Sequence, residues 1–155
     1  MDKLLFREAT LSDLDTLLQF EQGVVTAERP FDSTLKSGTI HYYDLEALIQ
    51  SKDARFVVGH IDSEIICCGY GKKMMAKDFQ KIASYIYIGF MYVQPAYRGK
   101  GISQKIIDNI KTWADHLDIK EVRLDVYAEN ESAVKAYEKA GFKQHLITMR
   151  FSGSE

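Results

Sequence analysis

Residues 93–105 read Val93-Gln94-Pro95-Ala96-Tyr97-Arg98-Gly99-Lys100-Gly101-Ile102-Ser103-Gln104-Lys105, which predicts a strand end, a tight basic turn and a helix start. An apolar, aromatic run at 85–93 precedes the turn, and isoleucines at helical spacing follow it. Glycines permit left-handed backbone and close ligand approach, and the first N–H groups of a helix favour negative charge. We therefore expect residues 98–103, here called the anion cradle, to bind a phosphate. The alternative is a plain strand-to-helix connection with solvated cations.

The composition is that of one folded domain over residues 1–155. Hydrophobic residues make up 46% of the chain and charged residues 27%, as in soluble globular proteins. A net charge of -2 gives no general attraction to nucleic acid or to an anionic membrane. We find no apolar run that could span a bilayer and no signal-peptide form. Because Cys67 and Cys68 are adjacent and the histidines are scattered, we expect no disulfide, no metal site and a reduced, cytoplasmic protein.

Hydrophobic periodicity predicts the order strand, helix, helix, strand, strand, strand, helix, strand, helix, strand. The expected strands are 4–8, 55–61, 65–73, 85–93, 121–126 and 142–151. The expected helices run from a cap at Thr10 or Ser12 to before Pro30, over 42–49, over 102–117, and from Asn130 to a C-cap at Gly141. Hairpins in the middle together with helical crossovers indicate a mixed α/β (α+β) fold, with a mostly antiparallel twisted sheet flanked by helices.

Three motifs follow one another along the C-terminal part of the chain. They are Val93-x-Pro95-x-x-Arg98-Gly99-Lys100-Gly101-Ile102, Leu124-x-Val126-x-x-x-Asn130 and Ala136-Tyr137-Glu138-Lys139-Ala140-Gly141-Phe142. Together they resemble the GNAT superfamily of acyl-CoA-dependent N-acyltransferases. The resemblance covers the C-terminal part of the chain closely, and the N-terminal part agrees with the family in element order.

The resemblance implies an acetyl-CoA site along the strand and the cradle. Backbone groups of Met91 and Val93 would pair with pantetheine as an added strand, and an amide near Met91 or Tyr92 would stabilise an oxyanion. Asn130 would hydrogen-bond the pantetheine arm. The pyrophosphate would be held by the backbone amides of Arg98, Gly99, Lys100, Gly101, Ile102 and Ser103. The family usually has glycine or alanine where Ser103 stands, and because the amide survives we expect binding to persist.

The resemblance also implies direct attack of a neutral primary amine on acetyl-CoA, without a metal. Tyr137 would protonate the leaving thiolate, because the pKa of a phenol, about 10, is close to that of an alkyl thiol. Without the resemblance, Tyr137 would be interpreted as a half-buried aromatic on an amphipathic helix.

The general base is the open question in this sequence. Family members that use a direct carboxylate base carry it on the strand before the cradle, at the position of Tyr87 here. Alternation predicts that Tyr87 shares a strand face with Met91 and Val93. A neutral phenol is a poor base, so we expect either a water chain or an N-terminal carboxylate to take the ammonium proton. The candidates are Glu28 and Asp32, with Glu21 behind them.

Other functions fit less well. Gln104 stands where the dinucleotide-binding fingerprint has its third glycine, and Lys100 is followed by Gly101 rather than by serine or threonine as in a P-loop. The alternative function is a non-catalytic acyl-CoA-binding or protein-interaction module on the same fold. The expected acceptor is a small amine, a peptide N-terminus or a lysine, with neither nucleic acid nor membrane as partner and a homodimer as one assembly.

Overall fold

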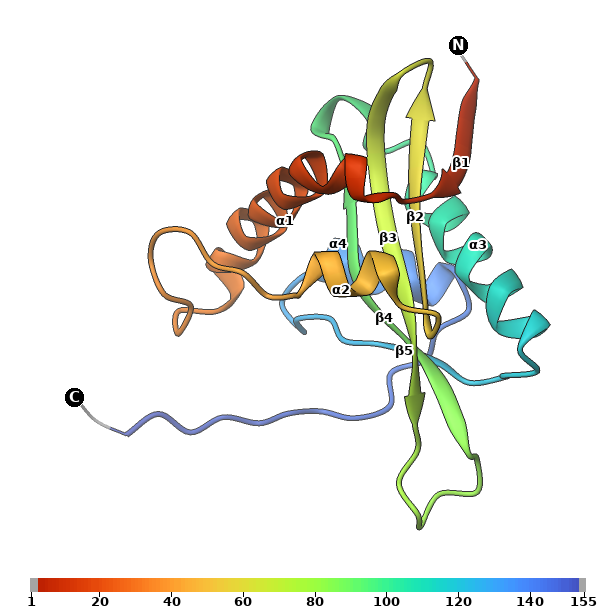
Figure 1. Cartoon of the computed structure of the whole chain (residues 1–155). Helices are drawn as coiled ribbons and strands as arrows, with labels where there is room; N and C mark the ends of the chain where they lie inside the picture. Colours follow the sequence, from red (N-terminus) through yellow and green to blue (C-terminus); the bar gives the residue numbers. More distant parts are fainter. Residues whose placement is uncertain (1–2, 154–155) are drawn as a thin grey trace. The chain divides into compact units, whose positions relative to one another are not determined.

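The computed structural model describes residues 3–153, and the chain divides into two compact units, Met1–Asp125 and Val126–Glu155 (Figure 1). The first unit contains a sheet and helices α1 to α3, and the second contains α4. No helix within residues 3–153 combines the length and the apolar character that crossing a membrane requires.

A five-stranded sheet in the order β1-β2-β3-β4-β5 forms the centre of the first unit. Strands β1 to β4 pair antiparallel, and β4 pairs with β5 in parallel. The strands are β1 Leu4–Glu8, β2 Ala54–Ile61, β3 Glu64–Met75, β4 Ser84–Val93 and β5 Val122–Leu124. The predicted mixed, mostly antiparallel sheet is confirmed.

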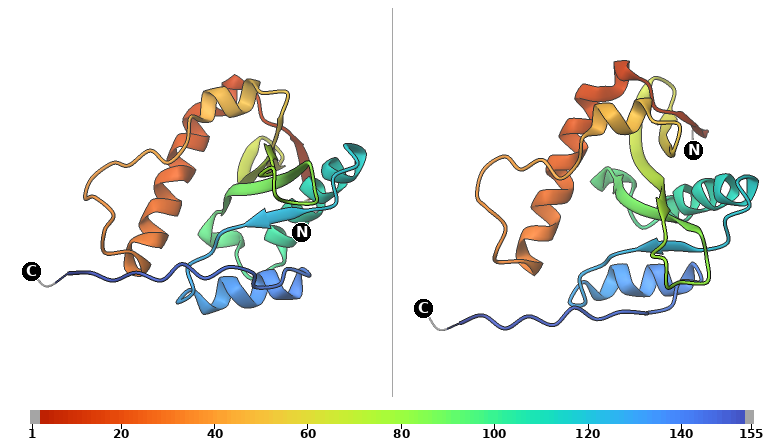
Figure 2. Two further views of the ribbon diagram at one scale, coloured as in Figure 1. Left: turned by 90° about the horizontal axis from the view of Figure 1, so that it is seen from below. Right: turned by 60° about the horizontal axis from the view of Figure 1, so that its bottom comes forward.

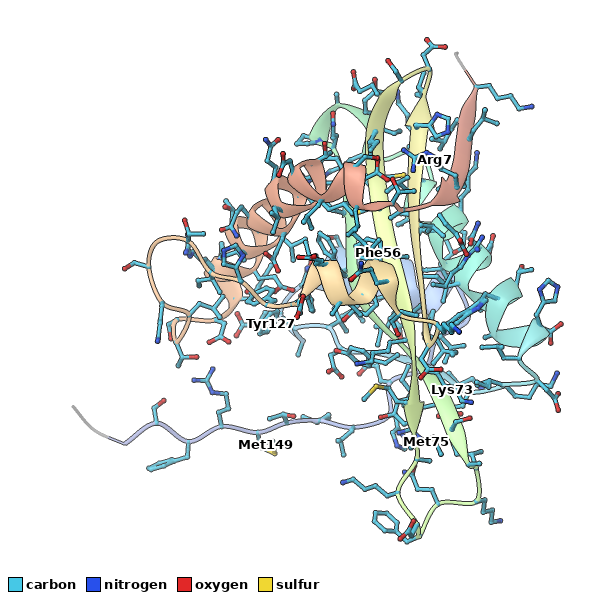
Figure 3. All side chains as sticks on the ribbon, viewed as in Figure 1. Arg7, Phe56, Lys73, Met75, Tyr127 and Met149 are labelled. Carbon is cyan, nitrogen blue, oxygen red and sulfur yellow. The ribbon has the colours of Figure 1, made fainter. Side chains whose placement is uncertain are left out.

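Helices cover both faces of this sheet (Figure 2). One face packs against α1 and α2, which span Leu14–Glu28 and Leu45–Gln50. The core of this layer consists of Leu17, Phe20, Leu45, Leu48, Phe56, Val58, Tyr70 and Phe90, and Figure 3 labels Phe56 within it. The other face packs against α3, Ile102–His116, so tightly that a Cβ at Gly69 or Gly71 would collide with its isoleucines.

A bidentate ion pair holds β1 to the start of α1. Asp13 is only 5% exposed, and its carboxylate accepts hydrogen bonds from Arg7 Nη1 at 2.8 Å and Arg7 Nη2 at 2.9 Å. It also accepts from the backbone N–H of Thr10 at 2.8 Å. The hydrogen bond from Arg7 is the main cause that lowers the pKa of the Asp13 carboxyl. This pair therefore fixes where the chain leaves the sheet.

Three predicted elements differ from the structure. The strand expected at 121–126 is shorter, and only Val122–Leu124 forms β5. The helix expected at 42–49 begins at Leu45, because the Asp44 side chain caps it by accepting a hydrogen bond from Ala47 N at 3.1 Å. The strand expected at 142–151 is not formed, and residues 142–153 carry no regular secondary structure. Apolar and β-branched residues favour a strand, but a strand forms only where a neighbour satisfies its backbone groups.

The second unit is built around α4, Glu131–Lys139. Asn130 caps its start by accepting a hydrogen bond from Ala133 N at 3.3 Å. At its end, Gly141 has a φ of 99°, and Phe142 N donates to Tyr137 O at 3.0 Å. These are the glycine and the long backbone bond of a Schellman motif, so both predicted caps are confirmed.

Candidate functional site

A β-bulge interrupts β4 at Gly89 and Phe90. The register with β3 shifts between Gly69 and Gly71, which leaves two residues of β4 opposite the single residue Tyr70. An extra residue in one strand bends that strand and redirects the side chains beyond it. The side-chain pattern of β4 therefore changes faces at the bulge.

The bulge separates Tyr87 from the residues that follow it. Ile88 and Met91 pair with the two β3 glycines that face α3, so both lie on the α3 side of the sheet. Tyr87 precedes Ile88 and lies on the opposite side, which is covered by α1 and α2. The prediction that Tyr87 shares a face with Met91 and Val93 is wrong, because period-two alternation fails across an inserted residue.

Beyond the bulge, one edge of β4 is open. The pairing with β5 covers Ile86 to Ile88 and ends there. Among residues 3–153, no strand continues the ladder along 89–93 on that edge. The hydroxyl of Tyr43 donates to Gly89 O at 3.0 Å where the open edge begins. An unpaired strand edge can accept an extended ligand through backbone hydrogen bonds.

The anion cradle follows directly after this edge. Gly99 and Gly101 have φ angles of 78° and 74°, which are left-handed. A Cβ at either position would meet no atom within 4 Å, so the backbone angle rather than crowding requires glycine. No side chain caps the start of α3, and its first turn holds no acidic residue. The first N–H groups of α3 are therefore available to an anion.

The cradle itself carries two cations, Arg98 and Lys100. Arg98 Nε donates to Val93 O at 2.8 Å, and its guanidinium lies 5.4 Å from the centre of the Tyr92 ring. The ammonium of Lys100 lies 5.7 Å from the centre of the Tyr97 ring. Positive charge at a helix start adds to the helix dipole in attracting an anion.

Phenols gather on the other face of the sheet, under α1 and α2. The ring centres of Tyr43 and Tyr70 lie 5.5 Å apart, and those of Tyr42 and Tyr43 lie 5.7 Å apart. Glu28, the last residue of α1, is half-buried, and the nearby Tyr42 side chain partly offsets the rise that burial causes in the pKa of its carboxyl. The charge of Glu28 also contributes to raising the pKa of Tyr43 and of Tyr87. A carboxylate and at least four phenols are therefore within electrostatic reach of one another.

Burial dominates the ionisation of this cluster. It is the main cause that raises the pKa of Glu28, and the nearby charge of Asp32 adds to it. Burial also raises the pKa of Tyr70 to about 12 and the pKa of Tyr87 further. Tyr43, Tyr70 and Tyr87 are consequently neutral at physiological pH, and Glu28 is a better proton acceptor than an exposed glutamate.

The other two predicted carboxylates have structural partners. Asp32 Oδ1 accepts hydrogen bonds from Thr34 N at 3.0 Å and from Thr34 Oγ1 at 2.6 Å, which closes a turn. Glu21 is fully buried, and its Oε2 accepts from the backbone N–H groups of Tyr42 and Tyr43 at 3.0 and 3.1 Å. Glu21 therefore positions the segment that carries the phenols.

One carboxylate at this site was missed from the sequence. Tyr87 Oη donates to Asp125 Oδ2 at 3.0 Å, just after the end of β5. The available signal was the alternation of charged Glu121, Arg123 and Asp125, which places these three side chains on one face of a strand. Nothing in that alternation indicates which strand lies beside them.

The remaining predicted residues lie in the second unit. Asn130 caps α4, and Tyr137 follows seven residues later on the same helix. Tyr137 therefore lies about two helical turns beyond the cap, roughly 10 Å along the axis of α4. The Tyr137 and Phe142 rings pack edge to face with their centres 6.2 Å apart.

Comparison with known proteins adds sequence relatives. The acetyltransferase (GNAT) family model matches residues 24–142. YdgE of Bacillus subtilis (strain 168), named an uncharacterized N-acetyltransferase, is 36% identical over 67 residues. That alignment covers 43% of this chain and 41% of the relative, so the shared stretch spans less than half of either protein.

Solved structures share the fold over almost the whole chain. A tetramutant of the BH1408 protein from Bacillus halodurans matches with a TM-score of 0.85 at 22% identity, covering 96% of this chain and 99% of that one. A predicted acetyltransferase with acetyl-CoA from Clostridium acetobutylicum matches with a TM-score of 0.71 at 17% identity, covering 97% and 96%. At these identities the likeness concerns the fold. Because the family model spans most of the sequence, the chain belongs to the acetyltransferase (GNAT) family.

Proposed function

We propose that the protein transfers an acetyl group from acetyl-CoA to a primary amine. The observation that carries the proposal is the continuity of the open β4 edge with the anion cradle. Acetyl-CoA has a matching order of parts, an extended pantetheine arm followed by a pyrophosphate. An edge that accepts an extended chain, followed by a helix start that accepts an anion, suits both parts.

Backbone groups do most of the binding in this proposal. Met91 and Val93 pair with the pantetheine arm, and an amide near Met91 or Tyr92 stabilises the oxyanion. The pyrophosphate is held by the amides of Arg98, Gly99, Lys100, Gly101, Ile102 and Ser103. The left-handed glycines and the absence of an acid in the first turn of α3 support this assignment. The motif resemblance supports Asn130 as a further partner of the pantetheine arm.

The acceptor amine binds among the phenols under α1 and α2 in this proposal. Glu28 would pair with its ammonium group, and the aromatic faces would add cation–π attraction. We retain Glu28 as a candidate base because burial raises the pKa of its carboxyl. Asp32 contributes by its charge, since its Oδ1 closes a turn, and Tyr87 contributes a neutral hydroxyl.

The proposed reaction is direct attack of the neutral amine on the thioester carbonyl. Holding both reactants together supplies much of the rate. The tetrahedral intermediate then expels the thiolate, which takes a proton from Tyr137. The nitrogen of the new amide loses its extra proton, which restores the phenol of Tyr137. The acceptor class remains a small amine, a peptide N-terminus or a lysine.

We further propose one domain over residues 1–155 and a reducing, cytoplasmic location. Cys67 and Cys68 are both free and buried. Burial raises the pKa of the Cys67 thiol to about 11, which keeps it protonated and unreactive.

An amine panel tests the function. Purified protein is mixed with acetyl-CoA and with a polyamine, an aminoglycoside, a lysine-containing peptide or a peptide with a free N-terminus, and thiol release is followed. Acetyl-CoA at about 100 times its Kd should stabilise the fold by about 2.7 kcal/mol, which is a rise in Tm of about 5–10 °C. S-acetylpantetheine, which lacks the pyrophosphate, should stabilise it much less.

The outcomes separate the proposal from its alternative. Stabilisation by acetyl-CoA together with thiol release for one amine class supports the transferase. Stabilisation without release for any amine favours the non-catalytic acyl-CoA-binding or interaction module, an alternative suggested by the phenol at Tyr87 where a strand carboxylate would act as base. No stabilisation contradicts both.

A further inference from the structure

Strand β4 carries a phenol, Tyr87, where a carboxylate base would be expected, but the carboxylate of Asp125, just after the end of β5, lies beside it. Tyr87 pairs in register with Arg123 of β5, and two residues later Asp125 accepts the hydrogen bond of the Tyr87 hydroxyl at 3.0 Å. The bulge turns Tyr87 toward the face that carries Glu28 and the other phenols. A phenol backed by a carboxylate thus lies where the proposed acceptor amine binds.

The neighbouring cation, Arg123, has partners other than Asp125. The guanidinium of Arg123 lies 4.1 Å from the centre of the Tyr85 ring, its Nε donates to Glu121 at 3.0 Å, and its Nη2 donates to Gln80 at 3.3 Å. These contacts engage the guanidinium, whose ion-pair partner is Glu121. Asp125 is exposed, so a proton that it receives can pass to water.

We propose that Tyr87 and Asp125 together remove the proton from the acceptor ammonium, with Asp125 as a positioning residue that acts through the phenol. This inference rests on the proposed acetyl transfer. The N–H bond of the ammonium breaks and its proton passes to Tyr87 Oη, while the phenol passes its own proton to Asp125 Oδ2. The products are a neutral amine, an unchanged phenol and a protonated Asp125, which releases the proton to water.

The environment suits a relay through a neutral phenol. Burial, followed by the charge of Asp125, raises the pKa of Tyr87, so the hydroxyl keeps its proton until another arrives. The charged and titratable groups around Tyr87 include Lys72 and Tyr70 on β3, Tyr43 before α2, Arg123 on β5, Asp125 just after β5, and Glu28 on α1. Glu28 would anchor the substrate cation from the other side.

Acceptors of different basicity test the relay. An alkylamine has a pKa near that of lysine, about 10.4, so only about one molecule in a thousand is neutral near neutral pH. For such an amine, Asp125→Asn should lower kcat/KM about 100-fold near neutral pH. For trifluoroethylamine, which is neutral at that pH, the loss should stay within about threefold, because no proton has to be removed.

Three further variants make the test specific. Tyr87→Phe should show the same dependence on amine basicity, and the double variant should be no slower than the slower single variant, because the two residues act as a unit. Asp125→Glu should recover part of the rate by restoring a carboxylate. Glu64→Gln, which removes an exposed carboxylate at the start of β3, is the control and should leave kcat/KM unchanged for both amines. The Kd of acetyl-CoA and the Tm should stay constant throughout.

Each result is decisive. An equal loss for both amines with an unchanged pH profile would make Asp125 a structural contact only and overturn the inference. A basicity-dependent loss in Glu28→Gln but not in Asp125→Asn would overturn it in favour of Glu28. If the unaltered protein binds acetyl-CoA but acetylates no amine, the proposed function fails and the inference with it. A selective loss in Asp125→Asn with partial recovery in Asp125→Glu supports it.

Discussion

Replacing Gly101 by alanine tests whether the start of α3 holds the pyrophosphate. Gly101 is the N-cap residue of α3, with a φ of 74° and a ψ of 18°. A Cβ there would meet no atom within 4 Å, so the substitution causes no collision. The cost is conformational, about 1–2 kcal/mol for an L-residue in the left-handed region.

The same cost fixes the expected change in stability. Alanine also restricts the unfolded chain, which offsets about 0.4–1 kcal/mol of the strain. For a cradle that keeps its left-handed geometry, the net loss should be about 1 kcal/mol, which lowers the Tm of a domain of this size by about 2–4 °C.

The substitution should also weaken the binding of acetyl-CoA, which is measured as a fold-change in its Kd. Without ligand, the strained cradle can relax toward right-handed backbone angles. Acetyl-CoA must then restore the left-handed geometry, so the strain that relaxation relieves reappears on binding, and complete relaxation would raise the Kd about 5- to 30-fold, as 1–2 kcal/mol requires. Titration calorimetry with acetyl-CoA measures the Kd, and thermal unfolding measures the stability.

Gly38→Ala is the matched control. Gly38 has a φ of 81°, and a Cβ there would also meet no atom within 4 Å. It lies between α1 and α2, in a segment apart from β4 and α3. It should lose a similar amount of stability and keep the Kd of acetyl-CoA unchanged. An unchanged Kd in Gly101→Ala together with an unchanged Tm would mean that the relaxed cradle binds equally well, and would refute the cradle as the pyrophosphate site.

Three further predictions concern single side chains. Tyr137→Phe should lower kcat about 100-fold without changing the Kd of acetyl-CoA, because only the acidic proton is lost; an unchanged kcat would remove its role as acid. Glu28→Gln should raise the Tm near neutral pH by an amount worth less than about 1 kcal/mol, since the group is half-exposed. Burial raises the pKa of Glu28, so its charge destabilises the fold above the ordinary glutamate pKa of about 4.3, and the gain should vanish below it; a gain that is constant with pH contradicts this. Arg7→Met should lower the free energy of unfolding by about 2 kcal/mol near neutral pH, because Asp13 loses its charged partner. Because the pKa of Asp13 is lowered in the fold, this loss should shrink as pH falls below about 3.9. Denaturant titrations at several pH values measure the loss, and a loss that stays constant as pH falls would contradict the prediction.

Local signals in the sequence predict the backbone geometry of the anion cradle and of α4 well. The left-handed glycines of the cradle, the amphipathic helix behind it and the two caps of α4 depend on residues within a few positions of one another. Their backbone conformation follows from glycine freedom, capping hydrogen bonds and hydrophobic periodicity. Gly89 within the aromatic strand was also a local sign of the bulge, since an isolated glycine in a strand often marks one.

The acceptor half depends on contacts between distant parts of the chain. Glu28 ends α1, Tyr43 precedes α2, Tyr87 lies on β4 and Asp125 follows β5. Which of these groups meet depends on strand order and on the bulge in β4. Spacing along the sequence carries no information on strand order, and the extra residue at the bulge that Gly89 marks reversed the predicted face of Tyr87 relative to Met91 and Val93.

The sequence by itself therefore determined the anion cradle, the helix behind it and the capped helix α4, because their geometry is set by near neighbours. Only the tertiary structure decided that Glu21 is buried and accepts hydrogen bonds from the backbone that carries the phenols. It also decided that Tyr87 faces α1 and α2 and donates its hydrogen bond to Asp125. The physical reason is that strand pairing joins residues far apart in the chain, and one inserted residue exchanges the faces of everything beyond it.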